Sequence, residues 1–148
     1  MTFLENGDRY VVDAPIVVKW ILNEPYSDMA RSIAVPGRTV LAPDVILSHI
    51  GTILRTRVSS SELEKQEADE ILRVVGLMPL QLFETWSLAA DALEIERRIR
   101  CAMPSCIYLA LALQEEAIYV TSSRELYVSV QDTALAEHIA WIGNLALR

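Results

Sequence analysis

The chain has 148 residues, a hydrophobic content of 52% and a formal net charge of −7 at pH 7. This length and composition predict one domain, residues 1–148, with a sizeable core, and they exclude a disordered protein. The acidic charge argues against a broad nonspecific nucleic-acid surface and would suit a basic partner.

No segment indicates export or a membrane anchor. The longest apolar run, Cys106 to Leu113, is too short to cross a bilayer. Residues 1–8 have no basic segment before an apolar one, so we expect no signal peptide and interpret them as a loose leader. Cys101 and Cys106 match no zinc or redox spacing, so we expect buried free thiols in a cytoplasmic protein.

The first structural signal is a short apolar strand followed at once by a helix. Residues 9–12 are typical of a buried parallel strand, and Pro15 suits the first turn of a helix that runs to about Leu22. Asp13 therefore lies where a strand ends and a helix begins, at the sheet edge where α/β proteins bind ligands. Two interpretations stay open: a metal-binding or catalytic carboxylate, and a helix N-cap.

The next elements alternate between helix and strand. In order, the pattern predicts a helix over 27–34 capped by Ser27, a strand over 38–41, a long helix over 44–58, and a helix over 61–75. Ser61 and Glu64 have the spacing of a capping box for the last of these helices. His49 lies at the edge of the apolar stripe of the long helix.

The second half continues this alternation. The pattern predicts a strand over 77–82, a helix over 85–99, a central helix from Met103 to about residue 113, a strand over 117–121, a short helix over 125–130 and a strand over 139–142. In the 85–99 helix we expect four side chains to be buried, those of Trp86, Ala89, Ala90 and Leu93. Alternating strands and helices predict a parallel sheet covered on both faces.

Four stretches, in this order and spacing, resemble the PIN domain, specifically the VapC-like toxins of bacterial toxin–antitoxin pairs. They are Val11-Val12-Asp13-Ala14 followed by Lys19-Trp20, then Leu41-Ala42-Pro43-Asp44, then Tyr108-Leu109-Ala110-Leu111-Ala112, and finally Tyr119-Val120-Thr121. The similarity covers about residues 9–142. It implies a PIN-like three-layer α/β/α sandwich with a central, mainly parallel sheet of four to five strands.

The resemblance also implies a metal-dependent endoribonuclease whose clustered acids hold Mg²⁺ or Mn²⁺, because hard cations prefer carboxylate oxygens. This sequence departs from that pattern. Of the four core acids only Asp13 is present; His49, Ser105 and Ser123 stand at the other three positions. Glu125 falls where some relatives carry one more acid. The substitutions remove about three negative charges, and hydroxyls and imidazole are poor Mg²⁺ ligands.

Three hypotheses follow. The first is a PIN-like protein that is catalytically impaired or inactive, with no cofactor, or with Asp13 as sole metal ligand. It would act by binding, as a homodimer or with an antitoxin or PIN-domain partner. The second is an active Mg²⁺- or Mn²⁺-dependent ribonuclease toxin that uses Asp13 and Glu125 on RNA. The third is a new ligand beside Ser105 and Ser123.

Two further patterns bear on these hypotheses. Ser105, Ser123, His49 and Asp13 are the residue types of a Ser–His–Asp triad, but no Gly-x-Ser-x-Gly elbow is present, which favours an inactive pocket lined by small polar side chains. The apolar edges of the helices at 44–58 and 61–75 fit an amphipathic partner helix or a second copy of the chain.

Overall fold

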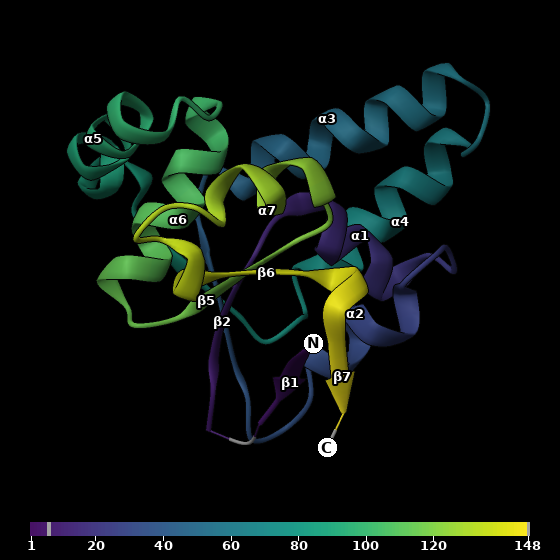
Figure 1. The fold of residues 1–148 in the computed structure, drawn as a ribbon. Coiled ribbons are helices and arrows are strands. Elements are labelled where there is room, and N and C mark those ends of the chain that lie inside the picture. Colours follow the sequence, from purple (N-terminus) through teal and green to yellow (C-terminus); the bar gives the residue numbers. More distant parts are fainter. Residues whose placement is uncertain (6, 148) are drawn as a thin grey trace.

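A sheet of five parallel strands forms the centre of the molecule (Figure 1). The computed structural model describes residues 1–5 and 7–147. In spatial order the strands are β4 (Leu80–Phe83), β3 (Thr39–Pro43), β2 (Arg9–Val12), β5 (Ile118–Thr121) and β6 (Ile139–Trp141). Tyr10, Val11 and Val12 are fully buried, as expected of a strand at the middle of a covered sheet.

Helices cover both faces of this sheet. The α-helices are α1 (Ala14–Ile21), α2 (Ser27–Ile33), α3 (Ile46–Ser59), α4 (Lys65–Val75), α5 (Ala89–Ile99), α6 (Met103–Gln114) and α7 (Arg124–Val130), with 3₁₀ turns η1 (Thr85–Leu88), η2 (Ala136–His138) and η3 (Ile142–Asn144). The strand order runs outward from β2 to β4 and then returns to β5 and β6. Because such crossovers are right-handed, α1 to α4 cover one face and α5 to α7 the other. Figure 1 shows α3 and α4 on the opposite side of the molecule from α5 and α6. The predicted α/β/α sandwich is therefore confirmed.

The reversal of strand order places a crevice beside the end of β2. Its neighbours β3 and β5 connect to helices on opposite faces, so the helices separate at this edge. Ligands of open α/β sheets bind at such a point. None of the helices in the described part of the chain is both long and apolar enough to span a membrane.

The prediction of a loose leader is wrong. Residues Thr2–Leu4 form strand β1, which pairs in parallel with β7 (Leu145–Leu147), and both Leu4 and Leu145 are buried. Asn6, within that leader, lies outside the described residues. A three-residue strand whose partner lies at the other end of the chain leaves no periodic signal in the sequence.

The predicted capping box at Ser61 and Glu64 is also wrong. Ser61 has φ +62°, a left-handed conformation, whereas an N-cap residue is extended. The N-cap of α4 is Glu64, whose backbone N–H donates to the carboxylate of Glu67 at 3.0 Å. The box therefore lies three residues later, and the helix begins at Lys65.

The prediction of which side chains of the 85–99 helix are buried is wrong, because a different face of the helix points into the core. Trp86 is 82% exposed and Leu93 is 43% exposed, whereas Leu88, Ala92 and Ile95 are buried. The segment begins as the 3₁₀ turn η1, and Thr85 fixes that turn because its N–H and hydroxyl both donate to Asp44 Oδ1, at 3.1 and 2.6 Å. The buried stripe of this segment is therefore the one that carries Leu88, Ala92 and Ile95.

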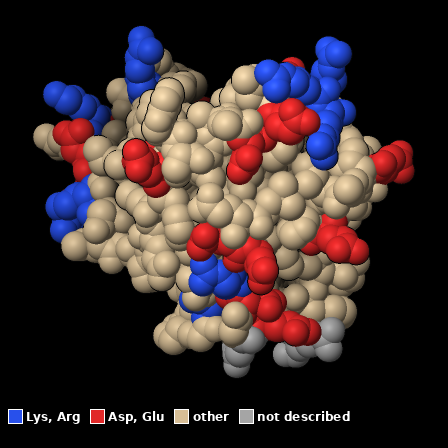
Figure 2. Space-filling model, turned by 90° about the vertical axis from the view of Figure 1, so that its left-hand side faces the viewer, with Lys and Arg blue, Asp and Glu red and all other residues tan. Residues whose placement is uncertain are grey.

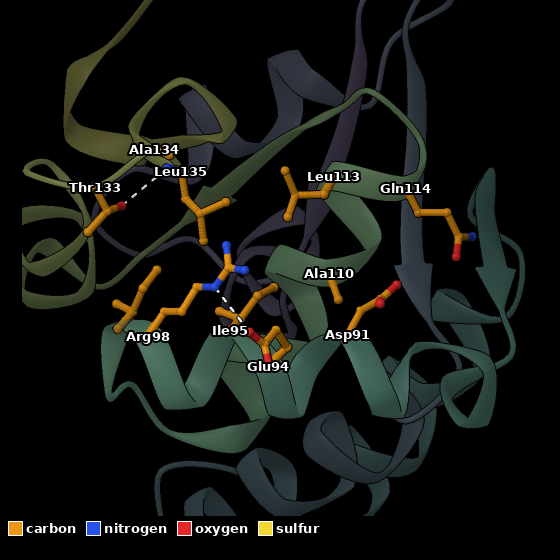
Figure 3. A pocket seen from close by; sticks show the side chains of 11 residues that line it. Asp91, Glu94, Ile95, Arg98, Ala110, Leu113, Gln114, Thr133, Ala134 and Leu135 are labelled. Atoms are coloured by element: carbon orange, nitrogen blue, oxygen red, sulfur yellow. Dashed lines mark hydrogen bonds and ion pairs between the residues drawn. The ribbon is translucent and has the colours of Figure 1, made fainter.

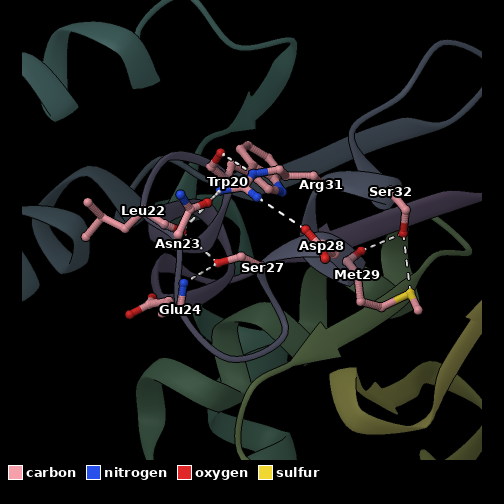
Figure 4. A network of polar contacts seen from close by, with 9 residues as sticks. All are labelled: Trp20, Leu22, Asn23, Glu24, Ser27, Asp28, Met29, Arg31 and Ser32. Atoms are coloured by element: carbon pink, nitrogen blue, oxygen red, sulfur yellow. Dashed lines mark hydrogen bonds and ion pairs between the residues drawn. The ribbon is translucent and has the colours of Figure 1, made fainter.

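A polar network fixes the turn between α1 and α2 (Figure 4). Ser27 does not cap α2 as expected: its buried hydroxyl donates to Leu22 O at 2.6 Å and accepts from Glu24 N–H at 3.0 Å. Arg31 donates to three acceptors in the last turn of α1 and just after it, namely Trp20 O at 3.0 Å, Leu22 O at 3.3 Å and Asn23 Oδ1 at 2.6 Å. One guanidinium thus satisfies carbonyls that the helix end leaves free.

Arg31→Ala should lower the free energy of unfolding by about 1–3 kcal/mol, because it removes the side-chain donor to the partly buried carbonyl of Trp20 and one of the two donors to Leu22 O. Urea unfolding followed by circular dichroism measures this change. Arg73→Ala is the matched control: Arg73 is exposed and, among the residues that the structure describes, pairs only with the exposed Glu70, so its loss should change stability by less than about 1 kcal/mol. Equal effects of the two substitutions would contradict the capping role of Arg31.

Candidate functional site

Asp13 is a buried carboxylate at the junction of β2 and α1. The residue is 8% exposed. Its Oδ1 accepts a hydrogen bond from the backbone N–H of Ile16 at 3.3 Å, so Asp13 is the N-cap of α1. The N-cap interpretation of this residue is therefore confirmed.

The second oxygen of Asp13 is held by the neighbouring strand. Oδ2 accepts from the hydroxyl of Tyr119 at 2.7 Å and from that of Thr121 at 3.4 Å. Val12 is paired with Val120 in the β2–β5 register, and side chains two apart on a strand point to the same face. Tyr119 and Thr121 therefore converge on the residue that follows Val12.

A second tyrosine extends this network to α3. The ring of Tyr108, on α6, stacks on that of Tyr119 with centroids 5.4 Å apart. The hydroxyl of Tyr108 is 2.8 Å from Nδ1 of His49, on α3. Side chains from α3, α6 and β5 thus connect His49 to Asp13 through two tyrosines.

The titration properties of these groups follow from burial. Burial raises the pKa of Asp13 from 3.8 to about 6, although hydrogen bonds from Tyr119, Ile16 and Thr121 act in the opposite direction. Burial, and then the charge of Asp13, raise the pKa of Tyr108 and of Tyr119 well above the usual value. Partial burial lowers the pKa of His49, so its imidazole is neutral at pH 7.

Three of the predicted site residues lie around one hollow, which we name the Asp13 hollow. Its volume is about 280 Å³, and its lining includes Asp13, Pro15, His49, Pro104, Ser105, Tyr108 and Tyr119. Ser105 is partly buried in the first turn of α6. The structure thus brings Asp13, His49 and Ser105 together from three distant segments.

Ser123 and Glu125 lie outside the lining of the Asp13 hollow. Ser123 is the N-cap of α7: its Oγ accepts from Leu126 N–H at 3.1 Å, and its own N–H donates to Thr121 Oγ1 at 3.0 Å. Ser123 therefore touches the Asp13 network only through Thr121. Glu125 is exposed in the first turn of α7.

This donor set does not fit a magnesium centre. Among residues 1–5 and 7–147, no group of three or more His, Cys, Asp or Glu side chains is placed to hold a metal ion. The only carboxylate that lines the hollow is Asp13, and both of its oxygens accept hydrogen bonds from the protein. A hard divalent cation requires several oxygen ligands, usually with more than one negative charge.

The same residues do not form a Ser–His–Asp triad. The Nδ1 atom of His49 is bonded to Tyr108, and no hydrogen bond in the described chain joins His49 to Asp13, Ser105 or Ser123. A triad requires the nucleophile, the base and the acid to be in hydrogen-bond contact.

Sequence reasoning missed the two tyrosines and Thr121. All three lie within stretches that carried the PIN resemblance, but there they read as buried strand or helix residues. The available signal was the alternation Tyr119-Val120-Thr121 beside Asp13, which puts two hydroxyls on one face of β5.

A second cleft lies away from Asp13, between α5, α6 and residues 133–135 (Figure 3). Its volume is about 410 Å³; Ile95, Leu113 and Leu135 give it an apolar lining, and the ion pair of Arg98 with Glu94 lies at its side. Figure 2 shows the side of the molecule that α5 and α6 form, with acidic and basic groups scattered around a broad uncharged area. This face offers no continuous basic surface for nucleic acid.

Comparison with known proteins identifies the fold. No protein-family model and no curated protein sequence matches the chain. Solved structures do match: PAE2754 from Pyrobaculum aerophilum has a TM-score of 0.67, 15% identity and coverage of 92% of both chains. VapBC2 from Rickettsia felis, bound to a DNA fragment from its promoter, has a TM-score of 0.64, 12% identity and coverage of 90% of this chain and 98% of that chain.

A third match is VapC20 from Mycobacterium tuberculosis, a toxin that cleaves the sarcin–ricin loop. Its TM-score is 0.60 at 12% identity, with coverage of 78% of this chain and 89% of that chain. These likenesses show that the chain has a VapC-like PIN-domain fold, as the sequence resemblance implies.

The raised pKa of Asp13 predicts a pH-dependent contribution to stability. Because the folded pKa lies above the unfolded value, the folded state binds the proton more tightly, and stability falls as the pH rises from about 4 through about 6. Two pKa units correspond to about 3 kcal/mol. Urea unfolding of the wild type and of Asp13→Asn at several pH values measures this, because groups common to both proteins cancel in the difference.

The wild-type minus Asp13→Asn difference in unfolding free energy should decrease over that pH range and be level above it. A difference that is constant from about pH 4 to 7 would contradict the raised pKa.

Proposed function

We propose that this VapC-like PIN-fold protein lacks the Mg²⁺- or Mn²⁺-dependent ribonuclease activity that the PIN resemblance implies and acts by binding protein partners. The observation that carries the proposal is the state of Asp13, whose carboxylate is buried and accepts three hydrogen bonds from the protein. A metal ion would have to displace at least one of these donors to reach an oxygen.

The electrostatics of the hollow support the proposal. A PIN-type metal site gathers several carboxylates whose mutual repulsion a divalent cation relieves. Here Asp13 faces a neutral His49 and the neutral hydroxyl groups of Ser105 and Tyr119. One negative charge that is already hydrogen-bonded is a weak attraction for a cation that must shed its water.

The alternative is an active ribonuclease that uses Asp13 and Glu125. Glu125 is exposed on α7 and does not line the hollow, which argues against a shared metal ion.

Binding to a partner is supported by the surface of α3 and α4. These helices form a groove of about 320 Å³, which we name the α3–α4 groove; its lining includes Gly51, Leu54, Arg55, Val58, Lys65, Ala68 and Leu72. An apolar floor with charged margins suits an amphipathic helix. The similar structures include toxin–antitoxin complexes, so we propose an antitoxin-like protein as the partner, alongside a homodimer of the chain itself.

With Mn²⁺ and a structured RNA, the purified protein should give no cleavage above that of Asp13→Ala or Glu125→Gln. The reason is that one hydrogen-bonded carboxylate does not hold a catalytic cation. Gel analysis of end-labelled RNA measures cleavage, and isothermal titration with Mn²⁺ measures binding directly. Cleavage by the wild type that Asp13→Ala abolishes would overturn the proposal.

A restored variant provides the positive control for this prediction. His49→Glu, Ser105→Asp and Ser123→Asp combined return carboxylates to the three positions that the PIN resemblance marks as acidic. The triple variant should bind Mn²⁺ at least about tenfold more tightly than the wild type, because each carboxylate adds charge and oxygen ligands.

Binding of an antitoxin-like protein, where one is encoded beside this chain, should weaken about tenfold or more in Leu72→Asp, because a charge would enter the apolar α3–α4 groove. Leu72 is 47% exposed, so the substitution leaves the core intact. Leu93→Asp is the matched control, since Leu93 is 43% exposed on α5. Co-purification and titration measure binding, and equal loss in both variants would contradict the assignment of the groove.

A further inference from the structure

The two cysteines of the chain meet at the junction of α5 and α6. Arg100 ends α5 with φ +63°, and the chain turns back so that Cys101 lies over the first turn of α6. Cys106 lies in that turn and is fully buried, whereas Cys101 is partly exposed. The sequence spacing suggested no relationship between them.

Their sulfur atoms are in direct contact. The Sγ–Sγ distance is 2.7 Å, which exceeds the bond length of a disulfide by roughly 0.7 Å. The Sγ of Cys106 also lies 3.5 Å from the carbonyl oxygen of Cys101, which it can reach as a donor. Cys101 and Cys106 are the only cysteines in the full sequence, so no other thiol competes for either partner.

We propose that Cys101 and Cys106 form a reversible dithiol–disulfide site that hydroperoxides oxidise. The sulfur of Cys101 attacks the peroxide oxygen, which breaks the O–O bond, gives a sulfenic acid at Cys101 and releases water from hydrogen peroxide. The sulfur of Cys106 then attacks the sulfur of Cys101, forms the S–S bond and expels the hydroxyl group as a second water. Two thiols and one peroxide thus give one disulfide and two waters.

The order of the two steps follows from exposure. Cys101 is accessible to a peroxide in solution, and Cys106 is not. Burial and the hydrogen bond with Cys101 raise the pKa of the Cys106 thiol to about 12, which keeps it a thiol at neutral pH. Cys106 therefore acts as the resolving partner, held in contact with the sulfur that reacts first.

The proposal does not depend on any nuclease or partner-binding activity. It concerns α6, however, which also forms part of the lining of the Asp13 hollow. Pro104 and Ser105, between the two cysteines, line the Asp13 hollow, as does Tyr108 two residues after Cys106. A bond between Cys101 and Cys106 would close a short ring around the start of α6 and fix this wall of the hollow.

Hydrogen peroxide followed by thiol counting tests the site. The protein is treated, quenched, unfolded in guanidinium and labelled with N-ethylmaleimide, so that buried Cys106 is also counted. Intact mass spectrometry should show a single chain that carries neither label and is lighter than the unlabelled, reduced chain by two hydrogen atoms. Dithiothreitol should restore both thiols. The oxidised form should also unfold at a higher temperature than the reduced form.

Three results would overturn the proposal: both thiols still labelled, loss of thiols with added oxygen atoms, or a disulfide between two chains. Cys101→Ser is the control, because its partly exposed position tolerates the change; it should keep one labelled thiol after treatment. Cys106→Ser is the reciprocal control, in which oxidation should stop at the sulfenic acid of Cys101, which dimedone traps. If Cys106→Ser does not fold, Cys106→Ala takes its place.

Discussion

The buried carboxylate of Asp13 is the point at which three elements of this molecule are joined. It ends β2, caps α1 through Ile16 N–H, and accepts two hydroxyls from β5. Buried charges are tolerated only when they are hydrogen-bonded or paired. The hydrogen bonds that satisfy this group connect the start of α1 to β5, and one of the donors, Tyr119, also stacks on Tyr108.

The hydrogen bonding of Asp13 also explains how the chain can keep the shape of a PIN-type site without the carboxylates that metal binding requires. A VapC-like PIN fold places the end of β2 in a crevice where the strand order reverses, and this chain retains that crevice. A metal-dependent site needs carboxylate oxygens that are not already hydrogen-bonded within the protein, so that they can bind the cation. Here two hydroxyl groups and a backbone N–H donate hydrogen bonds to the carboxylate of Asp13 instead. Retention of the fold therefore implies nothing about retention of the reaction.

Much of the fold could be predicted from the sequence, because it depends on local patterns. The strand at 9–12, the helix start at Pro15 and the apolar helix at 106–113 each follow from residues close together in the sequence. The errors in the prediction lie where a contact between residues far apart in the sequence determines the local structure. Thr85 bonded to Asp44 turns Trp86 outward, and β1 finds its partner at residues 145–147. Asp13, His49 and Ser105 could be named beforehand, but Tyr119 was missed, because the alternation at 119–121 points to Asp13 only once the β2–β5 register is known.

The junction of α5 and α6 shows the same dependence on three-dimensional contact. The cysteines are five positions apart in the sequence, and in a continuous helix that spacing would place the two side chains about 140° apart around the axis. The left-handed Arg100 and the turn before Met103 break the helix, which lets Cys101 fold back onto Cys106. Because α6 carries both this pair and one wall of the Asp13 hollow, the proposed disulfide at its first turn would constrain the segment that carries Ser105. Under the proposed chemistry, oxidation of the cysteine pair would reach the Asp13 hollow through the helix that bounds it.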